Sequence, residues 1–174
     1  MKWKIPFFGK DPDPDGEAAS RLYRSVVERA RKPDWYIVGG VPDTVDGRFD
    51  MVALSLSLLI LRIETIDTPR AQRLVVRLTE HFVEDMDSSL RTIGIGDMAI
   101  SKQVGNTVSS LGGRLGAYRE AFRQNSGLRM ALKRNVFRNE AEQEQLDWMA
   151  ERVREESLRL GQISDEAFFT GEAA

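Results

Sequence analysis

The chain has 174 residues, 41% of them hydrophobic and 30% charged, which is ordinary for a globular domain with one buried core. Its formal net charge of −2 gives no general attraction for nucleic acid, so we expect no DNA partner. The sequence contains no cysteine, which excludes disulfides, zinc–thiolate sites and thiol nucleophiles.

The chain begins with a segment of unusual composition, MKWKIPFFGKDPDPD. We expect residues 1–15 to form a flexible basic and aromatic tail, because the prolines break any helix there. In residues 1–10 lysines alternate with aromatic side chains, which suits peripheral contact with a membrane. This segment lacks the apolar core of a secretory signal, and the longest apolar run, residues 51–61, is too short to span a bilayer. The expected localisation is therefore cytoplasmic.

Apolar residues at helical spacing predict a first helix over residues 16–31, which Pro33 ends. The connection over residues 34–47 is long, and such connections are often functional. A second helix is expected over residues 49–63, with Asp46 as a candidate N-cap. This helix is apolar on nearly every side, so we expect it to be the most buried.

A third helix should begin at Thr68, a cap that is followed by proline in the first helical position. After a loop at residues 93–96, a fourth helix is expected to continue to Phe122. Ser126 is a candidate cap for a short helix through residue 136. Asn139, with Glu142 three residues on, is a candidate cap for a last long helix, and residues 164–169 leave room for one further turn.

Alternation at period two never persists, so no strand is expected. The predicted fold is all-α: a single domain over residues 16–170, packed as an irregular bundle of about six helices.

The turn-forming segment VPDTVDGRFDM from Val41 carries more polar residues than a connector needs. Three further segments are read together with it: HFVEDMDSSLR from His81, IGIGDMAISK from Ile93 and GGRLGAY from Gly112. In this order they resemble bacterial members of the ubiquinol-cytochrome c chaperone family. The resemblance implies a non-catalytic assembly chaperone for the cytochrome bc1 complex (ubiquinol-cytochrome c reductase) that binds newly made cytochrome b without a cofactor. It implies that the client is met at the inner face of the cytoplasmic membrane, and it leaves open contact with the ribosome or with a second assembly factor.

We expect the client-binding surface to come from the loops and arginines of these segments. Arginine suits such a surface because its planar, weakly hydrated guanidinium pairs with carboxylates. The candidate partner-binding residues are Pro42, Asp43, Asp46, Gly47, Arg48, Arg91, Gly94, Gly96, Asp97, Arg114 and Arg119.

A structural explanation competes for several of these residues. Turn and cap chemistry alone accounts for most of residues 42–47. We expect Arg48 and Arg114 to belong to the client surface, although a buried arginine that fixes residues 43–50 would explain the same sequence. Family members often carry a histidine and a tryptophan in the buried helix, where this chain reads LSLSL, so any client contact by those residues would differ here.

The remaining motifs favour structural roles. Residues 84–87 are expected to form a solvated acidic face rather than a metal site, and residues 94–97 a turn and cap rather than a phosphate loop. Gly112 and Gly116 are expected to allow tight packing inside the protein rather than against a client helix.

Two other functions remain open. A haem- or small-molecule-binding helical protein is the alternative function, and it would need a pocket with convergent polar groups. The single histidine, His81, cannot build a metal cluster by itself. Contact with the ribosome would need a basic patch, for which the candidates are Arg129, Lys133, Arg134 and Arg138.

Overall fold

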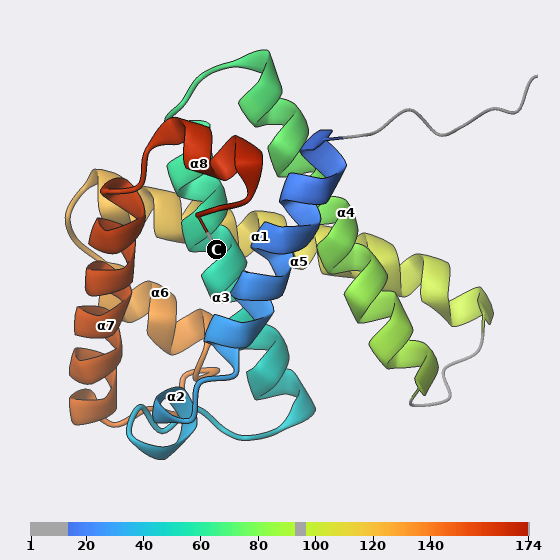
Figure 1. The fold of residues 1–174 in the computed structure, drawn as a ribbon. Helices are drawn as coiled ribbons and strands as arrows, with labels where there is room; N and C mark the ends of the chain where they lie inside the picture. Colours follow the sequence, from blue (N-terminus) through green and yellow to red (C-terminus); the bar gives the residue numbers. More distant parts are fainter. Residues whose placement is uncertain (1–13, 93–96, 174) are drawn as a thin grey trace, which may run out of the picture.

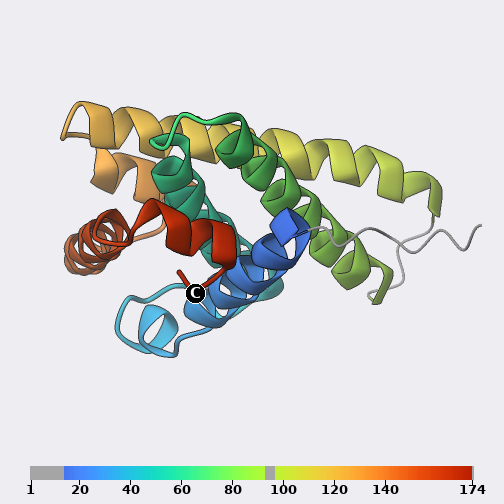
Figure 2. The same cartoon turned by 45° about the horizontal axis from the view of Figure 1, so that its top comes forward.

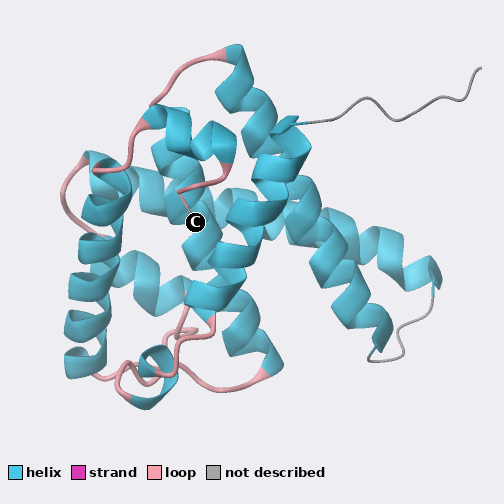
Figure 3. Ribbon diagram, in the orientation of Figure 1, coloured by secondary structure: helices cyan, strands magenta, loops and turns pink. Residues whose placement is uncertain are grey.

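The computed structural model describes the backbone of residues 14–92 and 97–173, and the side chains of residues 15–89 and 105–173. These residues form eight helices and no strand, which confirms the all-α prediction (Figures 1 and 3). The expected tail lies almost entirely outside the described residues. The helices are α1 (Pro14–Ala30), α2 (Asp34–Ile37), α3 (Val45–Glu64), α4 (Pro69–Thr92), α5 (Asp97–Arg123), α6 (Leu128–Asn135), α7 (Gln143–Gly161) and α8 (Asp165–Thr170).

Helix α3 is the centre of the fold. Twelve of its twenty residues are buried, which is the largest buried share of any helix over the described side chains. It packs against α1, α4, α5 and α7, and it lies between α1 and α5 in both views (Figures 1 and 2). Leu54 and Leu58 are only 1% and 5% exposed, which confirms that the helix after Gly47 is the most buried. Its nearly continuous apolar surface is what allows four helices to surround it.

The start of α3 differs from the prediction. Thr44 has extended backbone geometry, and its hydroxyl accepts a hydrogen bond from the Gly47 backbone N–H at 3.1 Å, so Thr44 is the N-cap. The prediction of Asp46 as the cap is wrong, and the helix begins four residues earlier than expected. Asp46 lies in the first turn, where a carboxylate is favoured by the helix dipole.

Glycine is required at position 47 because the backbone is crowded there. A Cβ atom at Gly47 would lie 1.9 Å from the carbonyl oxygen of Pro42. The residue sits inside α3, so its role is to admit this close approach rather than to supply an unusual φ angle. The turn at residues 42–47 therefore closes tightly against the first turn of α3.

Of the other predicted helix caps, the one at the start of α4 is correct and those at the starts of α6 and α7 are not. The Thr68 cap is confirmed, because its hydroxyl accepts from the Ala71 N–H at 3.1 Å. The predicted cap at Asn139 is wrong: α7 begins after Glu142, whose backbone N–H donates to the Gln145 side chain at 3.0 Å. The cap of α6 is Gly127, at φ 78°, rather than Ser126. In these two cases the chain turns through a left-handed residue before the helix, a feature that cap patterns alone do not reveal.

The long connection between α1 and α3 contains structure that was not predicted. Helix α2 lies within it, and two aromatic side chains of α2 fold back onto the end of α1. Trp35 Nε1 donates to the Arg29 carbonyl at 2.8 Å, and the Tyr36 hydroxyl donates to the Ala30 carbonyl at 2.8 Å. These bonds satisfy carbonyls that the end of a helix leaves without a partner.

The glycines of α5 do not serve the purpose expected of them. A Cβ atom at Gly112 or Gly116 would meet no atom within 4 Å outside the helix's own neighbouring backbone. The prediction that they allow tight packing inside the protein is therefore wrong, because the side of α5 that carries these two glycines faces open space, whereas Leu111 and Tyr118 of the same stretch are buried.

Replacing Gly47 with alanine should destabilise the protein by about 2 kcal/mol or more, since the new methyl group would collide with backbone that cannot rotate away. Gly112→Ala is the matched control. It should stabilise α5 by about 0.5–1 kcal/mol, because alanine has the higher helix propensity and the space is empty. Thermal and urea denaturation measure both changes, and equal stability of the two variants would contradict the crowding at Gly47.

Candidate functional site

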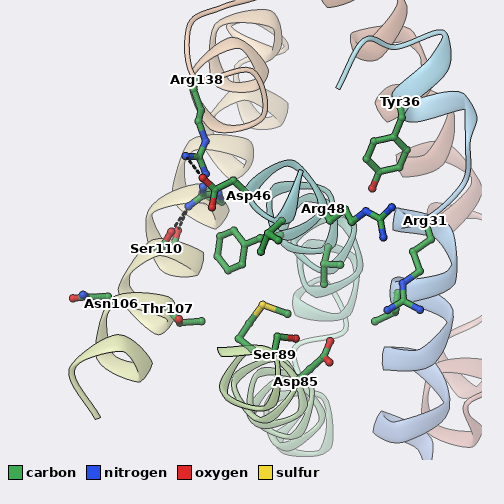
Figure 4. A pocket seen from close by; sticks show the side chains of 16 residues that line it. Arg31, Tyr36, Asp46, Arg48, Asp85, Ser89, Asn106, Thr107, Ser110 and Arg138 are labelled. Carbon is green, nitrogen blue, oxygen red and sulfur yellow. Dashed lines mark hydrogen bonds and ion pairs between the residues drawn. The ribbon is translucent and has the colours of Figure 1, made fainter. Parts of the chain in front are cut away.

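A groove of about 610 Å³ runs between the end of α1, the first turns of α3, and the facing parts of α4 and α5. Figure 4 shows that its side chains come from these four helices, from α2, and from the α6–α7 loop. The groove brings together three of the predicted partner-binding residues: Asp46, Arg48 and Arg114.

The floor of the groove is apolar. Val27 of α1, Phe49 and Val52 of α3, and Met86 of α4 line it. Val52 is buried and the other three are partly buried against the core. The groove can therefore accept apolar side chains without rearrangement of the core beneath it.

One wall is built around a buried carboxylate, Asp50, whose side chain is 0% exposed. Its two oxygens accept from Arg114 Nη2 at 2.6 Å and from Arg138 Nε at 3.3 Å. Arg138 also donates to Asp46 Oδ2 at 2.8 Å. Burial raises the pKa of Asp50, and the two guanidinium groups oppose this rise without cancelling it. The wall thus links α3, α5 and the α6–α7 loop through charge.

Arg114 is part of the scaffold as well as of the groove. Its side chain is only 15% exposed, and its guanidinium carbon lies 5.3 Å from the centre of the Phe49 ring. It also donates to the hydroxyl and carbonyl of Ser110, one turn away on α5. The expectation that Arg114 lies on the surface instead of in the core scaffold is therefore wrong, because buried Asp50 already holds it. Whether it also contacts a client remains a proposal.

Arg48 is exposed, as a role in client binding at the surface requires. Its side chain is 62% exposed and pairs with Asp43, which is 58% exposed, at 2.7 Å. The hydrogen bond from Arg48 lowers the pKa of Asp43. An ion pair this exposed contributes little stability, so Arg48 is free to exchange Asp43 for another carboxylate.

The other predicted residues are dispersed. Pro42 and Gly47 adjoin the groove through the tight turn described above. Arg119 pairs with Glu64 at 2.8 Å, at the opposite end of α3 and outside the groove. The predicted residues whose side chains lie outside the described residues are Arg91, Gly94, Gly96 and Asp97.

Several groove residues were not predicted. Asp85 is half-buried and accepts the Tyr23 hydroxyl at 2.8 Å, so the expected solvated acidic face is wrong for this carboxylate. Burial, followed by this hydrogen bond, raises the pKa of Tyr23. Arg31 and Tyr36 line the same side. No sequence pattern signals these three residues, because Asp85 is on α4, Arg31 follows α1 and Tyr36 is on α2, and only tertiary packing brings them to one groove.

Two of the four residues of the predicted basic patch pair with carboxylates, whereas Lys133 and Arg134 form no ion pair in the described structure. Arg129 pairs with Asp147, and Arg138 pairs with Asp46 and Asp50. In the part of the chain that the structure describes, no group of histidine and carboxylate side chains could hold a metal ion. Nor is any helix of that part long and apolar enough to cross a bilayer.

Replacing Arg114 with alanine should lower the free energy of unfolding more than replacing another arginine of the same helix. Arg114→Ala leaves Asp50 with one cation instead of two, and we expect a loss of about 2–4 kcal/mol. Arg119→Ala, the matched control on α5, should change stability by less than about 1 kcal/mol. Thermal denaturation separates the two outcomes.

The ion pair of Asp50 and Arg114 also predicts how the stability of the protein depends on pH. Asp50 binds its proton more tightly in the native than in the unfolded state, so it lowers stability as pH rises above the ordinary aspartate range. Losing Arg114 raises this native pKa further. The deficit of Arg114→Ala should therefore be small in acid and grow toward neutral pH, and a pH-independent deficit would show that lost packing, not charge, is responsible.

Two mammalian proteins are similar to this chain over nearly all of its length. The ubiquinol-cytochrome c reductase complex assembly factor 1 of Mus musculus is 26% identical over 98% of the chain, and that of Homo sapiens is 25% identical over 99%. The chain spans 55% of the length of each relative.

A solved structure and a family model agree with this similarity. The crystal structure of the Cbp3 homolog from Brucella abortus matches with a TM-score of 0.82 and 30% identity, over 91% of this chain and 88% of that one. The model of the family described as ubiquinol-cytochrome C chaperone matches residues 38–174. The resemblance expected from the four sequence segments is thereby confirmed, and the chain belongs to the ubiquinol-cytochrome C chaperone family.

Proposed function

We propose that this protein is a non-catalytic chaperone in the assembly of the cytochrome bc1 complex, and that it binds newly made cytochrome b through the groove. Membership of the chaperone family supports the general role. Both mammalian relatives are named as assembly factors of the ubiquinol-cytochrome c reductase complex.

One observation supports the groove as the client-binding site: three of the four segments that resemble the family meet there. The segment from Val41 supplies Asp46, Arg48 and Phe49, the segment from His81 supplies Asp85, Met86 and Ser89, and the segment from Gly112 supplies Arg114. These residues come from three helices and are far apart in the sequence. Their convergence on one cavity supports a shared binding role.

The chemistry of the groove favours binding over catalysis. Its carboxylates are already engaged, Asp46 by Arg138 and Asp85 by Tyr23. The single histidine, His81, stacks on Tyr23 and lies 3.7 Å from Glu84, outside the groove lining. The lining hydroxyls therefore have no histidine positioned as a base.

The alternative, a haem or small-molecule site, is favoured by a single observation, the volume of the groove. About 610 Å³ lies within the range of ordinary ligand pockets. Titration with haem, followed by absorbance, distinguishes the two functions. We expect no saturable, stoichiometric spectral change, and such a change would favour the alternative.

We also propose a cellular location for the protein. A membrane protein as client places the chaperone at the inner face of the cytoplasmic membrane, with residues 1–10 as the segment suited to contact it. Contact with the ribosome has less support, because ion pairs engage Arg129 and Arg138, two of its four candidate residues. A second assembly factor remains a further candidate partner.

Deleting the gene should lower the amount of cytochrome bc1 complex in the membrane without lowering the message for cytochrome b. The reason is that an unassisted client is lost after synthesis rather than before it. Quinol–cytochrome c reductase activity and blue-native electrophoresis measure the complex, and transcript analysis is the control. Normal amounts of the complex in the deletion strain would remove the main functional claim.

Arg48→Ala should weaken the capture of cytochrome b from cells and leave the protein as stable as before. An exposed arginine usually changes stability by under about 0.5 kcal/mol when removed. Arg123→Ala is the matched control, since Arg123 forms an equally exposed pair with Glu120 away from the groove. Equal capture by the two variants would mean that Arg48 has no part in binding.

A further inference from the structure

We propose that the groove recognises a short, acidic and apolar loop of the client rather than one of its membrane-spanning helices. This inference rests on the proposed function, because it takes cytochrome b as the client. It adds what kind of segment the groove holds, and it follows from the size of the groove, its hydrogen-bonding groups and its charge.

The size of the groove limits how much of the client it can bury. A helix with its side chains is about 10–12 Å wide, so two turns occupy roughly 850 Å³ or more, and a spanning helix has about twenty residues. The groove is open on one side and has a volume of about 610 Å³. It can therefore bury only a few residues of the client, from a loop or from one face of a helix, and its polar and charged groups decide between the two.

The polar side chains of the groove favour an occupant whose backbone N–H and C=O groups are not already hydrogen-bonded. Ser89 of α4, with Asn106 and Thr107 of α5, lines the cavity, and within the described structure their side chains make no hydrogen bond. A spanning helix pairs all of its own backbone groups internally and would cover these side chains with apolar surface. A loop offers free N–H and C=O groups, so a loop, unlike a spanning helix, can hydrogen-bond to the groove side chains while its own backbone groups find partners.

The charge of the groove calls for a carboxylate. Four arginines line it, and three already hold carboxylates: Arg48 with Asp43, Arg114 with Asp50, and Arg138 with Asp46 and Asp50. Arg31 is the fourth, and in the described structure its side chain has no ion pair or hydrogen bond.

The surroundings of Arg31 define what its partner looks like. Figure 4 shows Arg31 and Arg48 on the same side of the groove, with Tyr36 above them and Asp85 below in this view. Asp85 accepts the Tyr23 hydroxyl and forms no ion pair with Arg31 in the described structure, so Arg31 can bind an acidic side chain from outside. Val45, 65% exposed, also lines the groove and adds an apolar side chain to it. An aspartate or glutamate beside a large apolar residue fits this arrangement.

Photo-crosslinking tests the inference on the full chain in cells that make cytochrome b. Benzoylphenylalanine replaces Val45 at the groove, or Val76, an exposed valine of α4 outside it, as the matched control. Cytochrome b should crosslink from Val45 and not from Val76. Protease digestion and mass spectrometry should place the crosslink in a loop with an acidic residue beside an apolar one.

The outcomes separate the two proposals. A crosslink from Val45 to a membrane-spanning helix overturns the loop inference and leaves the proposed function standing. No crosslink to cytochrome b from Val45 above the level seen from Val76 removes the groove as the client site, and the loop inference with it.

The charge of Arg31 is tested in the same experiment. Arg31→Gln should lower the crosslink yield from Val45 about three- to tenfold, as expected for one ion pair that binding shields from water. Arg31→Lys should restore most of it. Arg24→Gln, an exposed arginine of α1 outside the groove, should not change the yield. A yield unaffected by Arg31→Gln, with thermal stability unchanged, overturns the acidic part of the inference.

Discussion

The structure depends on one buried carboxylate, Asp50 in the central helix α3. A carboxylate without solvent costs several kcal/mol unless cations and hydrogen bonds replace the lost water. Arg114 of α5 and Arg138 of the α6–α7 loop supply that replacement, at 2.6 and 3.3 Å. Because both cations come from other segments, α3 reaches its buried position only when α5 and the loop are in place. The ion pairs are thus a condition for assembling this side of the fold and set the position of one wall of the groove.

Backbone geometry near Arg138 shows how strongly this arrangement is constrained. Arg138 and Asn139 both have positive φ, at 51° and 73°, and such left-handed conformations cost roughly 1–2 kcal/mol for residues other than glycine. The loop adopts them where Arg138 reaches both Asp46 and Asp50. We infer that the contacts of Arg138 offset this strain. The groove therefore has a rigid wall, fixed by buried charge. Its rim carries the exposed pair of Arg48 and Asp43, together with Arg31, which has no ion pair within the described part of the chain.

This division suits a protein that holds a client briefly and releases it. The rigid wall and apolar floor keep the cavity open without an occupant, so binding does not first require the fold to rearrange. Exposed ion pairs at the rim exchange partners at little cost, because water stabilises both arrangements almost equally. If the groove binds the client as we propose, specificity comes from the match between apolar floor, free hydrogen-bonding groups and cationic rim, and release requires only that a few such contacts break.

The sequence by itself determined the helical content, the central place of α3, the Thr68 cap and the family, because helical periodicity, caps and short motifs are local properties of the chain. It also placed Asp46, Arg48 and Arg114 among the candidate residues, and these three meet in one groove. Only the tertiary structure decided that Thr44 caps α3, that Gly112 and Gly116 face open space, and that Arg114 is held by Asp50 while Arg31 has no ion pair among the described residues. Asp50 and Arg114 are 64 residues apart, and their contact depends on how α3 and α5 cross. Local patterns carry no information about that crossing, since it is fixed by the packing of many side chains at once.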